Sequence, residues 1–433
     1  MSKKLLAASL ILGVLAQPVF AEGLPLPGGV FKSARAGFSP SEALDFHSRY
    51  SYQEIISAGD VALFHFLHPG LWLNGMIVGR SGDFVDLQVE PDSAIGQIQY
   101  TDGAPTLDDY LVSEASRAQG FIVMRGGKIV YESYPGMRPS DVHVWMSISK
   151  TVPALIVRLL VEEGKIDVET PVDSYIPALR GTAWSGVHVR DVLDMASGLD
   201  IAETQAARED AGSIVSRYNL SVTGEANADG RVEGQLDVIR SAKALRPPGE
   251  SFDYSSLNTT VLALLAEAVE DKRFAQIFEE RVWSKMTAEA DMHLAVSPDG
   301  TPQAHGFFSA RLRDLARYGL LYTPSWAKAA REQIVSPEYV RAIQTEGRKD
   351  IFLKGELGNR LTNRSFSIDP PTANTWQWDA VWDDGDFYKG GVYGQGLYVS
   401  PKKDLVIAFF STVMSSDLTQ YARRIALETP SAP

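Results

Sequence analysis

The chain has 433 residues, enough for a large core spread over two or three lobes, and its apolar and charged fractions (45% and 22%) are those of a globular protein. Its 41 basic and 54 acidic side chains argue against nucleic acid and anionic membranes as partners. It has no cysteine, which excludes a lipid-anchored N-terminus, disulfides, thiolate metal sites and a cysteine nucleophile.

The first 21 residues have the pattern of a secretory signal peptide. Lys3 and Lys4 precede an apolar run, and small residues end at a cleavage site after Ala21. The run is short and contains Pro18, and no later segment is apolar enough to span a bilayer, so a signal is favoured over an anchor. The mature chain would carry 39 basic and 54 acidic side chains, a net charge of −15. We therefore predict a periplasmic or secreted protein without stable membrane insertion.

Residues 22–105 form a predicted N-terminal extension that is rich in glycine, proline and aromatic residues. A helix is expected near Pro40–Phe46, followed by some short strands. His65 and His68 are three residues apart, but they have no carboxylate cluster nearby and Pro69 follows them. Aromatic packing is therefore favoured over a metal site for these histidines.

Regular patterns begin near residue 106 and continue to residue 433. A helix is followed by two strands around Gly126-Gly127, and a short helix ends at Ser197-Gly198. Residues 201–250 are polar and loop-rich. Further helices are expected at 255–271, 309–322 and 417–427, and strands at 390–401 and 404–412.

Strands at both ends and helices between them predict one α/β domain at 106–433, with an antiparallel sheet flanked by helices. A mainly helical subdomain at about 150–300 would interrupt this domain. A cleft between the two lobes is the expected place for a site.

The motif Ser-x-x-Lys occurs three times, at Ser147, Ser325 and Ser400. Only Ser147 precedes a long apolar helix, whose burial would include its first turn and Lys150. Residues three apart share a helix face, and burial lowers the pKa of a lysine, so a neutral amine beside a hydroxyl could act as its general base. An ordinary helix start, with a serine cap and a solvated lysine, explains the same spacing.

Two further stretches contain candidate site residues. Tyr254 stands just before a helix, where it either serves a site or packs the helix entry, with Ser255 and Ser256 as candidate caps. Lys389-Gly390-Gly391 opens an apolar strand. Glycine within a strand marks either a close approach by a ligand or backbone, or a bulge.

Taken in order, these three stretches resemble the serine β-lactamase and penicillin-binding-protein superfamily, whose signature is Ser-x-x-Lys, then Tyr-x-Asn or Tyr-x-Ser, then Lys-Thr-Gly or a variant. The phrases "GFIVMRGGKIVYESY", "VRDVLDMASGL", "FDYSSLNTTVLALL" and "YGQGLYVSP" are most similar to its class C-like branch, in the group of 6-aminohexanoate-dimer hydrolases and family VIII esterase-like serine hydrolases. The resemblance covers residues 106–430 and implies a β-lactamase-like fold.

The resemblance also implies roles for residues of this chain. Ser147 would attack an ester or amide carbonyl, Lys150 would take its proton, and Tyr254 would pass it to the leaving group and later activate the deacylating water. The backbone N–H groups of Ser147 and Val392 would form the oxyanion hole, and no metal or cofactor is required. The implied substrate-binding residues are Ser256, Lys389, Gly390 and Gly391.

Two departures from the superfamily pattern bear on the substrate. Ser256 stands where β-lactamases have asparagine, and Gly390 stands where threonine or serine is usual. Both changes count against penicillin turnover and D-alanyl-D-alanine peptidase activity, while Lys389 would keep one positive charge at the cleft edge. We therefore predict an exported serine hydrolase that cleaves a small-molecule ester or linear amide.

Three alternatives remain. A β-lactamase or a D-amino-acid peptidase would share this fold, and so would a catalytically inactive penicillin-binding sensor. A different hydrolase class is not supported, because the chain has no Gly-x-Ser-x-Gly motif and its seven histidines are scattered. The motifs do not separate an esterase from an amidase.

Overall fold

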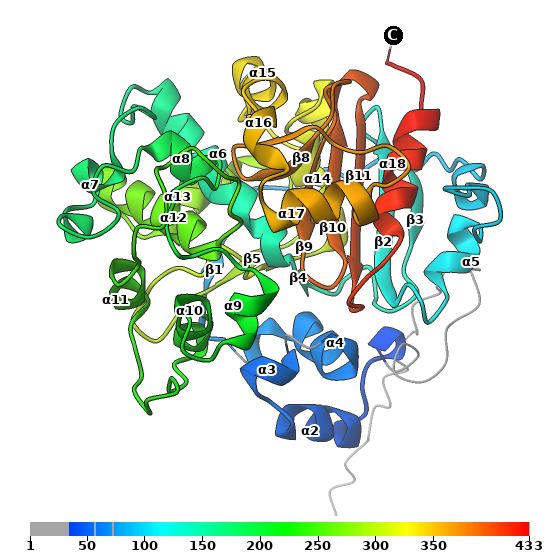
Figure 1. Ribbon diagram of the computed structural model, residues 1–433. Helices are drawn as coiled ribbons and strands as arrows, with labels where there is room; N and C mark the ends of the chain where they lie inside the picture. Colours follow the sequence, from blue (N-terminus) through cyan, green and yellow to red (C-terminus); the bar gives the residue numbers. More distant parts are fainter. Residues whose placement is uncertain (1–33, 56–57, 72, 433) are drawn as a thin grey trace, which may run out of the picture.

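A seven-stranded antiparallel sheet, in the order β3-β2-β11-β10-β9-β8-β7, forms the centre of the computed structural model, which describes residues 34–55, 58–71 and 73–432 (Figure 1). Its strands come from both ends of the predicted domain, which confirms the predicted fold class. The strands are β2 Ala118–Arg125, β3 Lys128–Ser133, β7 Ala373–Thr375, β8 Trp378–Val381, β9 Phe387–Gly391, β10 Gln395–Ser400 and β11 Leu405–Ser411.

Both faces of this sheet are buried, which explains why β11 is a continuous apolar run. Val406 belongs to the apolar core beneath α14 (Leu312–Leu320), whereas its neighbour Ile407 belongs to the core beneath α18 (Leu418–Glu428). Successive side chains of a strand point to opposite faces, so the two helices cover opposite sides of the sheet. Helices α15 Pro337–Thr345, α16 Lys349–Phe352 and α17 Glu356–Arg360 precede the last strands.

A helical region lies beside the sheet and is drawn mainly in green (Figure 1). A second antiparallel sheet, in the order β1-β5-β6-β4, joins it to the N-terminal segment. Its strands are β1 Gly75–Val78, β4 His143–Val144, β5 Met292–Ala295 and β6 Phe308–Ala310. The helices are α6 Thr151–Glu162, α7 Val172–Tyr175, α8 Val189–Leu193, α9 Gln205–Glu209, α10 Ile214–Thr223, α11 Gln235–Arg240, α12 Ser256–Glu270 and α13 Phe274–Arg281.

The first helices of the N-terminal extension pack beneath the main sheet and the helical region, and its later part runs beside β3 (Figure 1). The helix expected near Pro40–Phe46 is α2 (Pro40–Ser48), which begins with a capping box between Ser39 and Glu42. Helices α3 Tyr52–Ile55, α4 Gly59–Leu67 and α5 Leu107–Leu111 follow. The rings of His65 and His68 contact aromatic neighbours, as expected from the sequence.

Two local predictions are corrected by the structure. The polar segment 201–250 contains α9, α10 and α11, and the first two begin at the side-chain caps Thr204 and Ser213. The short helix expected to end at Ser197-Gly198 ends at Leu193 instead, because Met195 takes a positive φ of 53° and leaves the helical conformation.

The predicted signal peptide, residues 1–21, lies outside the described residues. Within the described ranges, no helix is long and apolar enough to cross a membrane.

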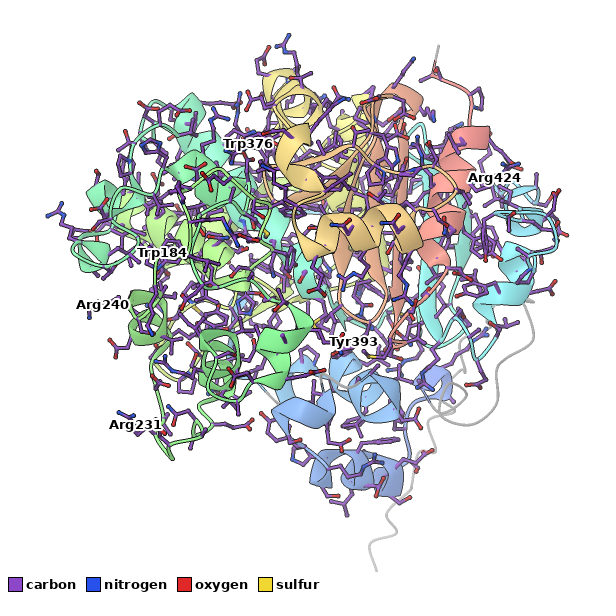
Figure 2. All side chains as sticks on the ribbon, viewed as in Figure 1. Trp184, Arg231, Arg240, Trp376, Tyr393 and Arg424 are labelled. Carbon is purple, nitrogen blue, oxygen red and sulfur yellow. The ribbon has the colours of Figure 1, made fainter. Side chains whose placement is uncertain are left out.

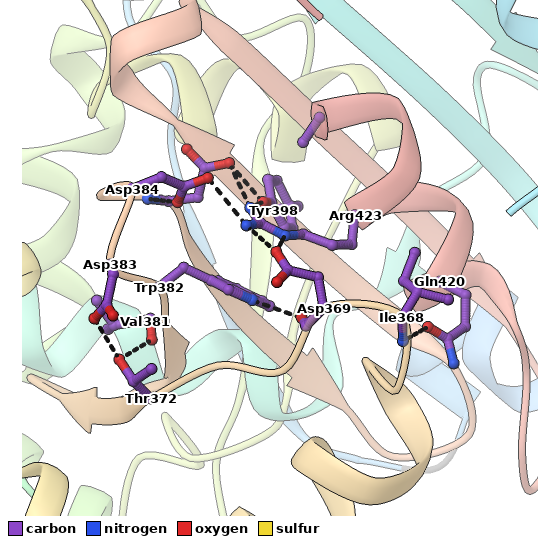
Figure 3. A network of polar contacts seen from close by, with 12 residues as sticks. Ile368, Asp369, Thr372, Val381, Trp382, Asp383, Asp384, Tyr398, Gln420 and Arg423 are labelled. Carbon is purple, nitrogen blue, oxygen red and sulfur yellow. Dashed lines mark hydrogen bonds and ion pairs between the residues drawn. The ribbon is translucent and has the colours of Figure 1, made fainter. Parts of the chain in front are cut away.

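Arg423 on α18 is the centre of a buried ionic network that joins this helix to the edge of the sheet (Figure 3). Its guanidinium pairs with Asp369, with Asp384 at 3.0 Å and with Asp386 at 3.0 Å. It also donates to the hydroxyl of Tyr398 at 2.6 Å. Burial and the charge of Asp384 raise the pKa of Asp386, so this carboxylate depends on its cationic partner.

We expect Arg423→Met to lower the free energy of unfolding by about 3 kcal/mol, because it leaves carboxylates without the cation that compensates their burial. Urea denaturation monitored by tryptophan fluorescence measures the loss. Arg424→Met is the matched control, since that neighbouring side chain is 44% exposed and, among the described residues, its ion pair is with Glu428 one turn away, so little change is expected. Equal unfolding midpoints for the two variants would contradict this assignment.

Candidate active site

Ser147 lies in a short 3-10 turn, Met146–Lys150, between strand β4 and helix α6. Met146 takes a positive φ of 48°, a conformation that bulky residues rarely adopt. The adjoining side chains of Trp145 and Ile148 are completely buried, while Ser147 is only partly buried. The turn therefore holds one accessible hydroxyl on a rigid base, and Ser147 does not cap the helix.

The ammonium or amine of Lys150 is surrounded by three oxygen atoms. Its Nζ lies 3.1 Å from Ser147 Oγ, 3.0 Å from Ser256 Oγ and 2.6 Å from the carbonyl oxygen of His305. A neutral amine has two N–H groups and one lone pair, so it can donate to Ser256 and His305 while accepting the O–H of Ser147. The geometry thus provides a base that is aimed at the Ser147 proton.

Burial lowers the pKa of Lys150 to about 7, although the charges of Glu203 and Asp379 oppose the shift and that of Lys389 adds to it. The side chain of Lys150 is 0% exposed. The alternative in which Lys150 is a solvated helix residue is therefore wrong. A lysine with this pKa is largely neutral just above pH 7, as a general base requires.

Tyr254 stands between the two lysines of the site. Its ring centroid lies 5.2 Å from Lys150 Nζ and 4.8 Å from Lys389 Nζ, and its hydroxyl interacts with that of Ser147. Burial and the charges of Asp379 and Glu203 raise its pKa well above the usual value. Tyr254 therefore keeps its proton at neutral pH and can donate it to a leaving group. The structure brings Ser147 and Lys150, from one turn, together with Tyr254, from the segment before α12.

Lys389 corrects the expectation of a positive charge at the cleft edge. The side chain is 0% exposed, and its Nζ lies 2.5 Å from Asp379 Oδ1. The other oxygen of Asp379 accepts the backbone N–H of Gly390 at 3.1 Å. Asp379 thus neutralises Lys389 beneath Tyr254, so Lys389 is not placed to bind a substrate carboxylate.

Glu203 belongs to the same charge cluster, although the sequence did not single it out. One of its carboxylate oxygens accepts the backbone N–H of Ser256 at 2.6 Å, and its own N–H donates to the carbonyl of Tyr254 at 2.8 Å. Arg208 pairs with the other oxygen at 2.5 Å. Burial opposes ionisation, but Arg208, Lys150 and the Ser256 contacts together lower the pKa of Glu203 to about 2. Glu203 therefore remains anionic and holds the Tyr254–Ser256 segment in position.

The end of strand β9 approaches the Ser147 turn at Gly391. A Cβ added at this glycine would lie 2.9 Å from both the Cβ of Met146 and the carbonyl oxygen of Trp145. This contact explains the glycine better than a bulge does, since β9 pairs regularly with β10 up to Gly391. The next residue, Val392, is 38% exposed, and neither its N–H nor that of Ser147 donates to an acceptor among the described residues.

The structure also shows what surrounds the other residues that the sequence analysis predicted to bind substrate. Ser256 Oγ contacts Lys150 Nζ rather than facing solvent, and its side chain is 7% exposed. Gly390 lies beside Tyr388 and bonds Asp379 through its backbone. Among the described residues, no group of three or more histidine, aspartate or glutamate side chains could hold a metal ion.

The sequence profile described as "Beta-lactamase" matches residues 108–429, about three quarters of the chain. The chain belongs to the β-lactamase family. This result confirms the resemblance found in the sequence motifs, and it places Ser147, Lys150, Tyr254 and Lys389 inside the matched region.

Individual members of the β-lactamase family extend the comparison. A 6-aminohexanoate-dimer hydrolase of Paenarthrobacter ureafaciens is 30% identical over 311 residues, which cover 71% of this chain and 75% of the relative. Esterase EstB of Burkholderia gladioli is 28% identical over 214 residues, which cover 45% of this chain and 52% of EstB.

Solved structures of the family share the fold. A Bacillus anthracis structure described as a 6-aminohexanoate-dimer hydrolase superposes with a TM-score of 0.69 at 21% identity, covering 87% of this chain and 96% of that one. EstCE1, a hydrolase with promiscuous acyltransferase activity, superposes with a TM-score of 0.53 at 16% identity, covering 72% of this chain and 94% of that one.

For this β-lactamase-family protein we expect kcat/KM for a neutral ester to rise with pH through a midpoint near 7, as Lys150 loses its proton. Glu203→Gln should move the midpoint to lower pH, because it removes a negative charge that favours the ammonium form of Lys150. The amide oxygen of the new side chain can still accept the Ser256 N–H.

Initial rates measured between pH 5 and 9 give both midpoints. Glu209→Gln, the same substitution at an exposed position of α9, is the control and should leave the midpoint in place. A Glu203→Gln midpoint that stays at the wild-type value, or moves upward, would refute this electrostatic role.

Proposed function

We propose that this protein is an exported serine hydrolase that cleaves a small-molecule ester or linear amide through an acyl-enzyme on Ser147. The observation that carries the proposal is the 3.1 Å contact between Ser147 Oγ and a buried Lys150 amine whose pKa is about 7. A serine next to a base of this kind is the arrangement that nucleophilic catalysis requires. The names of the two curated relatives, a hydrolase and an esterase, support the same reaction class.

Acylation begins when Ser147 Oγ attacks the substrate carbonyl and Lys150 takes its proton. The negative charge that develops on the carbonyl oxygen is stabilised by the N–H groups of Ser147 and Val392. Tyr254 donates its proton to the departing alcohol or amine, and Lys150 returns a proton to the Tyr254 oxygen. These steps leave an ester on Ser147, a neutral Lys150 and a neutral Tyr254.

Deacylation uses the same groups in reverse. A water molecule takes the place of the leaving group, and its proton passes to Lys150 by way of Tyr254 as its oxygen attacks the acyl carbon. Lys150 then returns a proton to Ser147 as the C–O bond breaks. Because the phenol of Tyr254 has a raised pKa, it relays the proton, and Lys150 is the final base.

The occupied polar groups around the nucleophile favour simple substrates. Ser256 is engaged by Lys150, Lys389 is neutralised by Asp379, and Gly390 has no side chain to donate a hydrogen bond. The groups that would hold the carboxylate of a penicillin are therefore absent or already in use. An ester or a linear amide needs only the nucleophile, the proton relay and the oxyanion hole.

The direct test compares a short p-nitrophenyl ester, a linear ω-amino-acid dimer and a chromogenic cephalosporin. Each missing polar contact costs on the order of 1–3 kcal/mol, so kcat/KM for the ester should exceed that for the cephalosporin by about tenfold or more. The linear dimer separates amidase from esterase activity. A cephalosporin that is the better substrate by a factor of about ten would favour the β-lactamase alternative instead.

A labelling experiment separates the enzyme from an inactive sensor of the same fold. A fluorophosphonate probe should modify Ser147, and mass spectrometry of the labelled peptide should locate the adduct there. Export is tested on the same protein, since a mature N-terminus that begins at Glu22 would support a signal peptide and retention of Met1 would oppose it.

A further inference from the structure

We propose that helix α4 of the N-terminal extension is a positioning element for the oxyanion hole, acting through Met146 and Tyr393. The helix ends at Leu67, well before residue 108, where the family match begins. The inference rests on the proposed function, because it assumes that the N–H groups of Ser147 and Val392 stabilise the reacting carbonyl oxygen.

Each proposed oxyanion donor has a strained neighbour in the chain. Met146, directly before Ser147, has a φ of 48°, and Tyr393, directly after Val392, has a φ of 65°. A left-handed backbone at a bulky side chain is unfavourable and persists only where the surrounding packing holds it. Whatever packs against Met146 and Tyr393 therefore controls where the two N–H groups point.

The side chains of Met146 and Tyr393 share one small apolar cluster, and the extension supplies much of it. Phe66 on α4 is completely buried, with its ring centroid 6.4 Å from that of Tyr393 and 5.7 Å from that of His143 on β4. Figure 2 places Tyr393 at the lower end of the sheet, directly above the blue helices of the extension. The buried extension residues of this cluster are Ile55, Ala62, Phe66 and Leu73.

Hydrogen bonds fix the start of α4 to the same end of the sheet. The backbone N–H of Gly59 donates to the carbonyl of Thr412 at 3.0 Å, and Asp60 pairs with Arg117 at 2.5 Å. The residue after Thr412, Val413, donates its N–H to the carbonyl of Tyr393 at 3.3 Å. Helix α4 therefore reaches Tyr393 by two routes, through the ring of Phe66 and through the Thr412–Val413 backbone.

A looser oxyanion hole has a defined kinetic signature. Its donors interact more strongly with the transition state than with the bound substrate, so their misplacement lowers kcat and leaves KM nearly unchanged. The proton relay of Lys150 and Tyr254 is not part of the apolar cluster around Met146 and Tyr393, so the pH midpoint should stay in place. A general loss of stability would instead reduce the folded fraction, and kcat per folded enzyme molecule would stay unchanged.

The experiment compares Phe66→Ala with Phe64→Ala in the full-length protein. Both changes remove a buried ring from α4, but Phe64 packs in a separate cluster with Phe46 and Val61, away from Met146 and Tyr393. Activities are measured on an oxo ester and on the matching thiono ester, whose sulfur is a poor hydrogen-bond acceptor. Rates are corrected for the folded fraction by active-site titration with the fluorophosphonate probe.

We expect Phe66→Ala to lower kcat for the oxo ester about tenfold or more with little change in KM, and to reduce the preference for oxo over thiono ester. Phe64→Ala should keep both the corrected kcat and that preference, and Phe66→Leu should recover much of the lost rate. Equal corrected kcat values for the two alanine variants, or an unchanged oxo/thiono ratio in Phe66→Ala, would overturn the role of α4. A wild-type protein that hydrolyses neither ester would overturn the proposed function itself.

Discussion

Ser147→Ala should lower kcat for ester hydrolysis by about 10³-fold or more, because no acyl-enzyme can form without the nucleophile. The fold should survive, since the Ser147 side chain lies in a turn whose rigidity comes from its buried neighbours Trp145 and Ile148. The loss of one neutral hydroxyl leaves Lys150 with two of its three oxygen neighbours, Ser256 and His305. Steady-state rates on a p-nitrophenyl ester and a thermal melt measure the two effects.

The chain provides its own control, because the motif occurs at two other serines. Ser325 donates its hydroxyl to Asp404 at 2.5 Å, at a turn next to strand β11. Its Ser-x-x-Lys motif does not contribute to the candidate active site. Ser325→Ala should therefore keep full activity and cost only stability. Retained hydrolysis in a folded, fluorophosphonate-resistant Ser147→Ala protein would exclude the acyl-enzyme scheme.

The residues that we propose to perform the chemistry could be singled out from the sequence because each stands at a recognisable junction. Ser147 and Lys150 precede a long apolar helix and Tyr254 precedes another. Gly390 and Gly391 were expected to open a strand at 390–401, but the structure places them at the end of β9, with a turn before β10. Such junctions can be recognised locally in the sequence, because the hydrophobic periodicity changes there and a glycine or a helix-capping residue follows. The structure shows that the three junctions converge, which a local pattern cannot establish.

The residues that tune the chemistry could not be predicted in the same way. Glu203 and Asp379 act on Lys150 and Tyr254 from segments that are far away in sequence, and neither has a periodic pattern around it. The sequence pattern also predicted an exposed charge at Lys389, whereas the side chain is buried. Its partner Asp379 lies on the neighbouring strand β8, and the sequence records the lysine without recording that pair. Burial and pairing are long-range properties that only the packed chain defines.

The helices and strands could be predicted from the sequence where they are long and apolar. The prediction failed where they are short. The continuous apolar run of β11 and the apolar faces of α6 and α12 are clear, whereas α9 to α11 are short and polar, and α9 and α10 depend on their side-chain caps. The turn that holds Ser147 is a 3-10 segment and not the first turn of α6. Its strained Met146 has no signature in the sequence, because a left-handed methionine is imposed by packing.

The buried charges of the site also form a balanced set. Glu203 pairs with Arg208 and Asp379 pairs with Lys389, so each carboxylate near Lys150 already has a cationic partner. Lys150 is left without a carboxylate of its own, and burial can then lower its pKa to about 7. Burial lowers the pKa of Lys150, and the two ion pairs limit the opposing effect of Glu203 and Asp379.

Gly391→Ala should lower kcat by about 10²- to 10³-fold, the size of effect expected when an oxyanion donor is displaced. The added methyl group would lie 2.9 Å from the Cβ of Met146 and from the carbonyl oxygen of Trp145, and 2.7 Å from the Cβ of Gln395. None of these atoms is the end of a flexible side chain, so the strand and the Ser147 turn must separate. Val392 follows directly, and its N–H would move away from the carbonyl oxygen that it stabilises.

Gly390→Ala is the matched comparison, one residue earlier in the same strand. Its added methyl would meet the ring and hydroxyl of Tyr388 at 3.1 Å or more, and a shift of a few tenths of an ångström relieves that contact without moving the Ser147 turn. We expect a clearly smaller loss of kcat there. Steady-state kinetics on a p-nitrophenyl ester, with active-site titration to count folded enzyme, separates the two variants. Equal losses, or a Gly391→Ala protein with wild-type kcat, would show that β9 does not supply the oxyanion donor, because the position of Val392 would then have no bearing on the rate.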